Sequence, residues 1–474
     1  MSFVVYDLAF LVLFSVGVIL FLYTRKHNLQ RHGILYLYKT KLGIKFIDRF
    51  ASRFRSILIP MQYVVLFSGY VLMISVFWMI VWTTYLYWKF PILSEAISAP
   101  PVFPLIPYFP KLFGLESFFP PLYFTYFIIA LGIVAVVHEF SHGIFARLHG
   151  FKIHSTGFAF LGPFLGAFVE PDEKQMAKAK KLPQMSVLAA GTFANVVMTV
   201  LFGAVMFLFF SSIFVPAGVR FDSYALTDIN LDDIASVQDS EIEGYVEITT
   251  KGSPDDSFNL APTKYYSTRE KLDYALEHDV KIGRVLIDAP AFRAQIPIGS
   301  TITEINGERI TSYEHFAGIL QSHSPGEVVN LKAGLVENSR IIQEISYDIE
   351  LDDRGGEAFL GVGFFSDKRE GVIGFLIENT YNKMKNPRIY YESTLGDFGW
   401  FVFYLLWWIV VINLLVALFN MLPLGILDGG RFFYLTVLGI TGSEKISKKS
   451  FSYITWFLLL LLFSMMIKWA LRFF

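Results

Sequence analysis

Long apolar stretches alternate with polar ones along the chain, and several of the apolar stretches could cross a bilayer as helices. A membrane-spanning helix needs about 20 predominantly apolar residues. The stretches that meet this length are 4–23, 58–88, 121–148, 186–214, 398–419 and 452–473. The pattern therefore predicts a multi-span α-helical membrane protein with about six transmembrane helices.

The long polar interval between the fourth and fifth spans has a different pattern. Residues 215–397 alternate short strand-like runs with turns and contain about thirty of the chain's 41 acidic residues. Such a region predicts an inserted soluble domain. Within it, a strand, a helix and a second strand are predicted at 301–305, 313–321 and 328–331. Residues 215–280 are predicted only as mixed α/β.

Two breaks interrupt the pattern near the apolar spans. Residues 155–170 place two short apolar runs about a Gly162-Pro163 turn, which predicts a β-hairpin. A hairpin this apolar is expected to be membrane-associated, with its open edges lining protein or a wet cavity. An ordinary interfacial loop is the alternative. After the fifth span, 420–431 contains Pro423 and three glycines, and broken helices of this kind persist in membranes where they line a site.

Composition agrees with a membrane location and limits the chemistry. The chain has 474 residues, of which 54% are hydrophobic, a mean hydropathy of +0.49 and a net charge of −1. Because cysteine is absent, disulfides and thiolate metal sites are excluded, and any zinc must be held by histidine and carboxylate ligands. The first apolar stretch lacks a basic leader and a small-residue cleavage site, so we interpret it as a retained span.

The distribution of basic residues predicts the orientation in the membrane. Residues 24–57 carry nine lysines and arginines against the single acid Asp48. Lysines also gather in 171–184 and before the last span, so these loops are expected in the cytoplasm. Residues 89–120 are rich in proline, which excludes a continuous helix and indicates an outer loop. The soluble domain and both termini are therefore expected outside the cytoplasm.

A short motif at the end of the third span carries the candidate chemistry. His138, Glu139 and His142 form the pattern H-E-x-x-H. Four residues apart on a helix, the two histidines share a face and can bind one Zn²⁺, and Glu139 is placed to take a proton from the attacking water. A chance match is expected roughly 0.01 times in a chain of this composition. Ionisable side chains inside an apolar helix usually mark function.

A catalytic zinc site usually has three protein ligands, so a third is needed. Asp428 is the only acidic residue from the fifth span through the glycine-rich break. It could instead cap the helix that begins at Gly429, but the need for a third ligand favours the metal. In the fourth span, Asn195 is an intramembrane amide that needs a partner, and Gly191 indicates close helix packing.

Three motifs occur in order along the membrane spans. They are HEFSH at 138–142, GTFAN at 191–195, and Asn420-x-x-Pro423 running on to Leu427-Asp428-Gly429. Together they resemble the site-2 protease family of intramembrane zinc metalloproteases. The family often has proline after the glycine of the second motif, where this chain has Thr192. The resemblance covers the third to fifth spans and the intervening PDZ-like domain. It does not cover the first two spans with their basic loop, nor residues 215–280.

The resemblance implies a complete set of site residues. The zinc ligands that it implies are His138, His142 and Asp428. It implies that Glu139 is the general base, and that Asn195 and Asn420 lie near the substrate, where they hold an unwound peptide or the developing oxyanion.

A second resemblance lies inside the inserted domain. PIGSTITEINGERI at 297–310, the helix after it and SPGEVVNL at 324–331 resemble a PDZ domain of the bacterial and archaeal protease-associated type. The module covers about 282–365. Within it, FLGVGF at 359–364 resembles the loop that holds a peptide carboxylate, although a strand with glycines has the same pattern.

Four regions follow from these predictions. Residues 1–120 form an N-terminal two-span region with a basic cytoplasmic loop and a proline-rich outer loop, and 121–214 form the first part of the catalytic membrane core. Residues 215–397 form an extracytoplasmic α/β domain that includes the PDZ-like module. Residues 398–474 form the second part of the core, with the broken helix and the last span.

The predicted function is that of a zinc-dependent intramembrane endopeptidase in a multi-pass protein of the cell membrane. It would hydrolyse peptide bonds in or near transmembrane segments, in regulated intramembrane proteolysis. The expected partners are transmembrane protein substrates, the lipid bilayer and a peptide ligand of the PDZ-like domain, with no nucleic acid.

Two other functions compete with this one. The first is a catalytically silent zinc-binding membrane scaffold or sensor that uses its PDZ-like domain. Glu139 argues against it, because a purely structural site needs no base there. The second is a transporter with broken helices, which would show paired inverted halves that this sequence lacks.

Overall fold

The computed structural model describes most of the chain as two compact units. The described residues are 3–33, 35–90, 99–102, 104–116, 119–161, 164–242, 244–251, 264–337, 340–364 and 384–471. We call Met1–Leu208 with Phe401–Phe474 the membrane unit, and Phe209–Trp400 the β-rich unit. The predicted boundaries at 120, 214 and 397 remain predictions.

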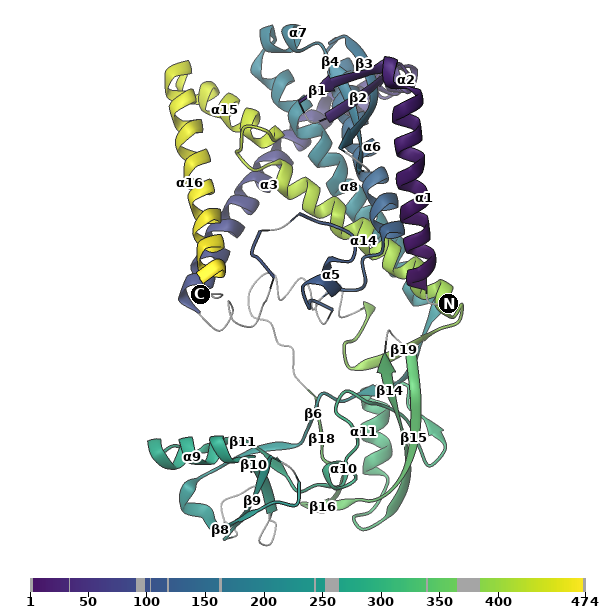
Figure 1. Cartoon of the computed structure of the whole chain (residues 1–474), viewed down its shortest axis with the longest axis vertical. Coiled ribbons are helices and arrows are strands. Elements are labelled where there is room, and N and C mark those ends of the chain that lie inside the picture. Colours follow the sequence, from purple (N-terminus) through teal and green to yellow (C-terminus); the bar gives the residue numbers. More distant parts are fainter. Residues whose placement is uncertain are drawn as a thin grey trace. The chain divides into compact units, whose positions relative to one another are not determined.

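Six helices among the described residues are long and apolar enough to cross a membrane (Figure 1). They are α1 (Phe3–Thr24), α3 (Arg55–Lys89), α6 (Phe124–Leu148), α8 (Lys181–Ile213), α14 (Asp397–Asn420) and α16 (Glu444–Ala470). The predicted class of multi-span helical membrane protein is confirmed. α16 begins before its apolar stretch, because the Ser443 side chain caps the helix by accepting from the backbone N–H of Ile446.

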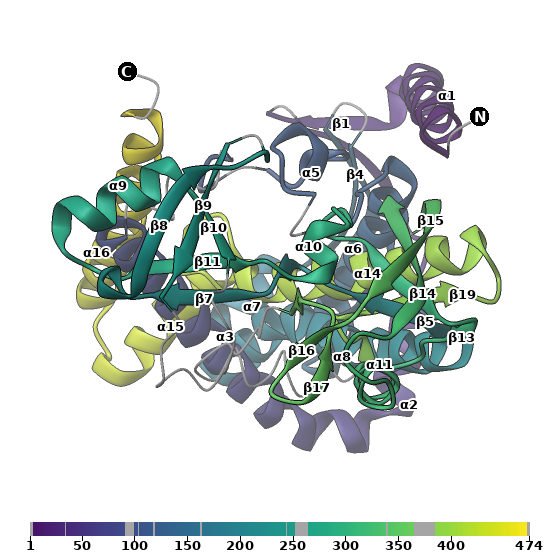
Figure 2. The same ribbon diagram turned by 90° about the horizontal axis from the view of Figure 1, so that it is seen from below.

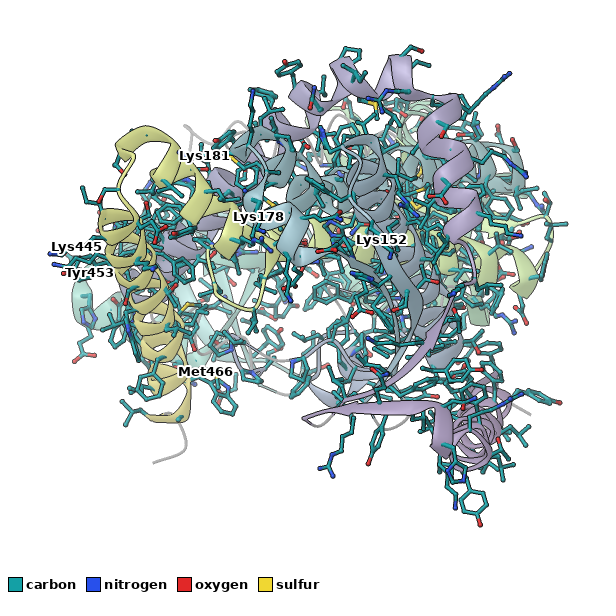
Figure 3. The ribbon with its side chains drawn as sticks, turned by 90° about the horizontal axis from the view of Figure 1, so that it is seen from above. Lys152, Lys178, Lys181, Lys445, Tyr453 and Met466 are labelled. Carbon is teal, nitrogen blue, oxygen red and sulfur yellow. The ribbon has the colours of Figure 1, made fainter. Side chains whose placement is uncertain are left out.

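Shorter helices complete the membrane unit. They are η1 (Lys26–Asn28), α2 (Ile44–Arg53), α5 (Phe109–Leu112), α7 (Glu173–Lys178) and α15 (Asp428–Thr441). In Figure 1, α2, α7 and the start of α16 lie at the same end of the membrane unit. Lys178 of α7, Lys181 of α8 and Lys445 of α16 are labelled in Figure 3, which looks down on this end. The lysine-bearing loops of the sequence therefore gather at one end of the helices.

A four-stranded antiparallel sheet lies beside α6. Its strands are β1 (Leu29–His32), β2 (Leu35–Thr40), β3 (Ile153–Leu161) and β4 (Phe164–Pro171), paired in the order β1-β2-β3-β4. β3 and β4 form the predicted hairpin, and the Gly162-Pro163 turn lies outside the described residues. The sequence did not predict β1 and β2, which extend the hairpin from the basic N-terminal loop. β4 is consequently an edge strand, and the depth of the hairpin in the membrane remains a prediction.

One ion pair ties the N-terminal strands to the hairpin. Lys39 on β2 and Glu170 on β4 are 2.8 Å apart across β3, and the hydroxyl of Ser155 donates to the same carboxylate at 2.5 Å. The hydrogen bonds from Lys39 and then Ser155 hold the pKa of Glu170 below its ordinary value. The basic loop is thus part of the same sheet as the strands next to the motif helix.

The predicted break separates α14 from α15. α14 ends at Asn420, and α15 begins at Asp428. A Cβ atom on Gly429 would lie 2.2 Å from the carbonyl oxygen of Met421, and one on Gly430 would lie 2.2 Å from that of Leu424. Only glycine permits this return of the backbone, which sets Asp428 at the start of α15.

The β-rich unit contains a five-stranded antiparallel sheet. Four of its strands lie in residues 215–280, which the sequence left as mixed α/β, and the fifth lies at the start of the predicted PDZ-like module. The strands of this sheet are β7 (Leu226–Ile229), β8 (Ile234–Asp239), β9 (Tyr245–Thr250), β10 (Lys264–Thr268) and β11 (Ile282–Ile287). They pair in the order β7-β11-β10-β9-β8, as Figure 2 shows. Ile248 and Ile282 are buried between this sheet and α9 (Arg269–His278), with Leu272 of the helix.

A second, six-stranded sheet of the β-rich unit holds the PDZ-like sequence. Its strands are β5 (Phe214–Arg220), β12 (Thr301–Ile305), β13 (Glu308–Arg309), β14 (Val328–Glu337), β15 (Arg340–Glu350) and β19 (Ile389–Ser393). The predicted helix at 313–321 is confirmed as α11 (Tyr313–Gln321), and the predicted strand at 301–305 is β12. Phe316 of α11 packs with Ile302 and Leu331 of the sheet. The β-rich domain is present, and its identity as a PDZ domain remains a prediction.

Short elements complete the β-rich unit. They are α10 (Pro290–Arg293), η2 (Leu231–Asp233) and the strand pairs β16 (Asp352–Arg354) with β17 (Glu357–Phe359) and β6 (Ser223–Tyr224) with β18 (Val362–Gly363). The FLGVGF sequence runs from β17 through β18. Its predicted role in holding a carboxylate remains a prediction.

Candidate active site

Helix α6 carries the H-E-x-x-H motif, and a buried aspartate from another helix fixes where α6 begins. Asp7 of α1 is only 1% exposed and accepts hydrogen bonds from the backbone N–H groups of Phe124 (2.7 Å) and Thr125 (2.9 Å). Tyr123, at the N-cap position, makes no side-chain cap. Asp7 therefore supplies the missing cap and a negative charge at the positive end of the helix. Asp7 is not among the predicted site residues, although an acid within a predicted span was the available signal.

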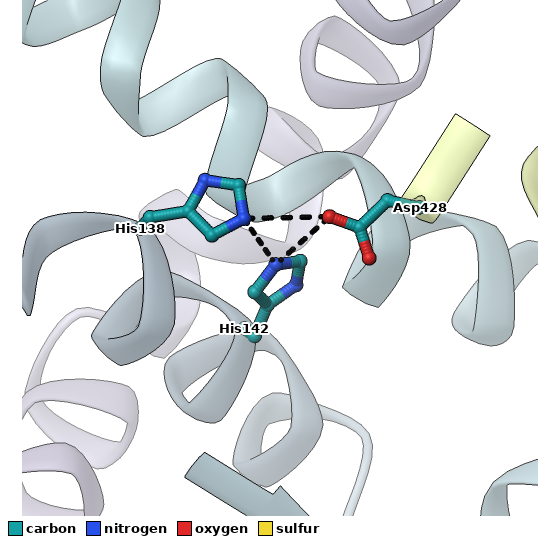
Figure 4. A group of neighbouring side chains, drawn as sticks. All are labelled: His138, His142 and Asp428. Atoms are coloured by element: carbon teal, nitrogen blue, oxygen red, sulfur yellow. Dashed lines mark hydrogen bonds and ion pairs between the residues drawn. The ribbon is translucent and has the colours of Figure 1, made fainter. Parts of the chain in front are cut away.

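The structure brings the three predicted metal ligands together (Figure 4). His138 and His142 project from α6, and Asp428 projects from the first turn of α15. The Nε2 atoms of the two histidines are 3.0 Å apart, and each lies 3.3 Å from Oδ2 of Asp428. Ligands bound at about 2.0–2.1 Å in a tetrahedral arrangement would be separated by roughly 3.3 Å. The donor spacing therefore fits a zinc ion.

The Nδ1 atoms of both imidazoles also have polar partners. Nδ1 of His142 donates to the backbone carbonyl of Val187 at 2.7 Å, which leaves Nε2 with a free lone pair. Nδ1 of His138 is 3.0 Å from the Asn195 amide nitrogen, while the buried Oδ1 of Asn195 has no partner among the described residues. Rotating this amide by 180° lets Oδ1 accept the Nδ1–H of His138 and satisfies both groups. Both histidines then present an unprotonated Nε2, the form that binds a metal.

Gly191 of α8 explains how these contacts are reached. A Cβ atom at this position would lie 2.4 Å from Nε2 of His142 and 2.7 Å from Cε1 of His138. The backbone of α8 therefore lies directly against the two imidazoles. Thr192, where the related motif often has proline, is buried, and its hydroxyl donates to the Ala189 carbonyl at 3.0 Å within a continuous helix. Sequence analysis predicted close packing at Gly191 but could not identify the histidines as its neighbours.

Glu139 lies between the edge strand and an open cleft. Its Oε2 atom accepts the backbone N–H of Val169 on β4 at 3.0 Å, so the carboxylate is fixed by the sheet. The cleft has a volume of about 320 Å³. Its polar wall consists of His138, Glu139, Asn420 and Asp428, and its apolar wall consists of Leu131, Val134, Ala135, Val416, Ile426 and Leu427. Nδ2 of Asn420 is 3.5 Å from Nε2 of His138, so this amide faces the same space as the ligands.

Residues 126–465 match the sequence profile of Peptidase family M50. The chain belongs to Peptidase family M50, the site-2 protease family. The matched region contains His138, Glu139, His142, Asn195, Asn420 and Asp428. It begins after α1 and α3, and, with six apolar helices, it identifies a multi-pass membrane protein.

Individual relatives are distant. An uncharacterized protein of Methanocaldococcus jannaschii is 25% identical over 64% of this chain and 54% of its own length. The zinc metalloproteases RasP of Geobacillus kaustophilus and Oceanobacillus iheyensis are each 22% identical over 40% of this chain, which covers 49% and 51% of their lengths. The chain thus spans about half the length of the curated relatives it matches. The names of the two RasP relatives support a zinc-dependent chemistry. Because the matched lengths are partial, the activity of this chain is a proposal.

Proposed function

We propose that this protein is a zinc-dependent endopeptidase that hydrolyses peptide bonds in or near transmembrane segments of membrane proteins. The observation that carries the proposal is the convergence of His138, His142 and Asp428 beside an open cleft, which is lined by two of them and by Glu139. A structural metal site is usually closed by four protein ligands, whereas a catalytic one keeps a position free. Three gathered donors, two of which line the cleft, fit the catalytic kind.

The chemistry divides between the metal and the chain. A zinc ion held by the two histidines and Asp428 would polarise the scissile carbonyl and acidify the attacking water. Glu139 takes the proton of that water and passes it to the leaving nitrogen. The hydrogen bond from the Val169 N–H supports this role, because it fixes the carboxylate at the edge of the cleft. It uses only Oε2 and does not involve Oε1. The half-buried position of Glu139 keeps it accessible to a substrate.

The two asparagines have different surroundings, which suggests different tasks. Asn420 lines the cleft, and its amide nitrogen can donate to the oxyanion that develops on the scissile carbonyl. Asn195 is fully buried against Nδ1 of His138. We assign Asn195 the task of holding that imidazole in the metal-binding tautomer.

A transmembrane helix hides its peptide bonds, so a substrate must unwind before it can be cut. The free edge of β4 offers a place for the unwound segment, because an extended peptide can add to an exposed sheet edge. The Glu139–Val169 contact joins that edge to the general base. A peptide paired with β4 would therefore pass beside the metal ligands.

The β-rich unit would select substrates. We place this domain outside the cytoplasm of a cell-membrane protein, with its PDZ-like module binding a peptide or excluding substrates with bulky ectodomains. The lysines before α8 and at the start of α16 support this orientation by the positive-inside bias. In this arrangement the protease acts in regulated intramembrane proteolysis on membrane proteins that have lost most of their outer domain.

The decisive test is Glu139→Gln, with exposed Glu173→Gln on α7 as the matched control. Glu139→Gln should retain zinc by elemental analysis and lose cleavage of a co-expressed single-span substrate by roughly 100- to 10,000-fold. Glu173→Gln should behave as wild type. Undiminished cleavage by Glu139→Gln with normal zinc would refute the mechanism. A wild-type protein that holds zinc but cleaves no transmembrane substrate would point instead to a silent scaffold or sensor.

A further inference from the structure

Helix α2 lies outside the region that matches the family and takes no part in the proposed chemistry. It nevertheless packs on the motif helix: Ile47 is fully buried and Ala51 is 4% exposed. Asp48 of α2 forms an ion pair with Arg147 of α6 at 2.6 Å, and Phe46 lies 6.0 Å, centroid to centroid, from Phe140 within the H-E-x-x-H motif. The face of α2 that carries Ile47, Asp48 and Ala51 therefore packs against α6.

A second face of α2 is aromatic and exposed. Phe46, Phe50 and Phe54 follow one another at four-residue intervals, with ring centroids 6.0 and 4.6 Å apart. Phe46 is 57% exposed and Phe54 is 40% exposed. Only Phe54 separates α2 from α3, a candidate span whose first turns expose Ile57 and Ile59. The exposed apolar side chains of the span thus begin three residues after Phe54, beyond Arg55 and Ser56.

A third face of α2 is basic. Lys45, Arg49 and Arg53 also recur at four-residue intervals, so they form a stripe displaced by about 100° from the phenylalanines. All three are exposed, and none forms an ion pair with any residue that the structure describes. The only acidic residue on the helix, Asp48, forms its ion pair with Arg147. Three unpaired cations beside an apolar stripe match the polar boundary of a membrane with negative headgroups.

We propose that α2 lies in the membrane interface, with its phenylalanines among the acyl chains and its basic stripe bound to the phosphates of anionic phospholipids. Because α2 leads directly into α3, a candidate span with exposed apolar side chains in its first turns, a lipid is favoured over a protein partner. Because α2 also contacts Phe140 and Arg147, bound lipid would hold the motif end of α6 against the membrane surface. This inference concerns lipid binding and does not depend on protease activity.

The test uses the full chain, whose lack of cysteine allows a single label. The Phe46→Cys variant is labelled with an environment-sensitive fluorophore. The labelled protein is then reconstituted in vesicles of phosphatidylcholine alone or with phosphatidylglycerol. Nitroxide-labelled lipids should quench the label, and more strongly when phosphatidylglycerol is present. A label at exposed Ser52, about 120° around the helix from position 46, should instead be quenched by iodide from water.

Charge variants then identify the cause. In a background with Lys45→Gln, Arg49→Gln and Arg53→Gln, the extra nitroxide quenching that phosphatidylglycerol causes should vanish. Each basic residue strengthens binding to an anionic membrane about fivefold, so three together contribute on the order of a hundredfold. Arg49→Lys with Arg53→Lys should preserve the extra quenching and so separate charge from side-chain shape. Replacement of Lys251, Lys271 and Lys281 in the β-rich unit by glutamine is the matched control and should change nothing.

Three results would overturn the proposal. If iodide quenches the label at position 46 in both membranes, α2 lies in water. If neither iodide nor nitroxide lipid reaches the label, a protein surface covers the helix. If the glutamine background, with normal zinc content, keeps the extra nitroxide quenching that phosphatidylglycerol causes, the basic stripe does not bind the headgroups.

Discussion

Gly191 sets how closely α8 can approach the metal ligands. We expect Gly191→Ala to lower zinc affinity by at least the roughly 10- to 100-fold typical of disturbing the contacts behind a metal ligand. The new methyl group would overlap both imidazoles, at 2.4 Å from His142 Nε2 and 2.7 Å from His138 Cε1. Zinc content at fixed free zinc measures the effect.

The matched control lies on the same helix. Gly203 of α8 has no atom within 4 Å of an added Cβ, so Gly203→Ala should keep full zinc and gain slightly in helix stability. If Gly191→Ala also binds zinc as the wild type does, the imidazoles must be able to move away from α8, and the rigid cradle described above is wrong.

At the residue scale, the sequence predicts which residues belong to the candidate site better than it predicts which residues they contact. The spacing of His138 and His142 places them on one helical face, and the shortage of acids near the break singles out Asp428. The structure gathers these three residues. No local pattern, however, indicates that Asn195 meets the back of His138 or that Asp7 caps α6, because both contacts join different helices.

At the scale of elements, the free edge of β4 decides whether a substrate can add as a strand. Val169 donates its N–H to Glu139 and therefore directs it away from β3; Ala167, two residues earlier, directs its N–H the same way. Ala167→Pro should remove this outward donor without removing a β3–β4 hydrogen bond. We expect cleavage to fall roughly two- to tenfold, the worth of one backbone hydrogen bond, with zinc content unchanged.

Ala167→Val provides the comparison, because it keeps the N–H and favours a strand. It should cleave at the wild-type rate in the same single-span substrate assay. Equal cleavage by Ala167→Pro and Ala167→Val would show that substrates do not pair with β4 at this position, and would leave Glu139 as the only functional neighbour of the strand.

Helices and strands that depend on neighbouring residues could be predicted from the sequence, whereas pairings between distant segments could not. Long apolar runs predicted all six spans, and the Gly-Pro turn predicted the β3–β4 hairpin. The pairing of β2 with β3 was not predictable, since it joins residues 36–40 to 156–160 and its ion pair links Lys39 to Glu170. The five-stranded sheet of the β-rich unit was missed for the same reason: β7 pairs with β11, more than fifty residues later.

At the scale of the whole molecule, orientation in the membrane follows from charge and can be tested by cysteine labelling. Lys178 ends α7, shortly before α8, and Lys445 lies in the first turn of α16, whereas Lys271 lies in the β-rich unit; all three are exposed. In intact cells, a membrane-impermeant maleimide should label Lys271→Cys, whereas Lys178→Cys and Lys445→Cys should react only after permeabilisation. The chain has no native cysteine, so each signal reports one position.

The pattern of labelling separates two kinds of error. Lys178 and Lys271 flank α8, a single candidate span, so they must lie on opposite sides if α8 crosses the membrane. Labelling of both from the same side would mean that α8 does not cross. Labelling with every side exchanged would keep the six spans but invert the protein, and the positive-inside bias would then have misled us. Only the predicted pattern puts the motif end of α6 in the cytoplasmic half and the β-rich unit on the side where it could meet the outer parts of membrane proteins.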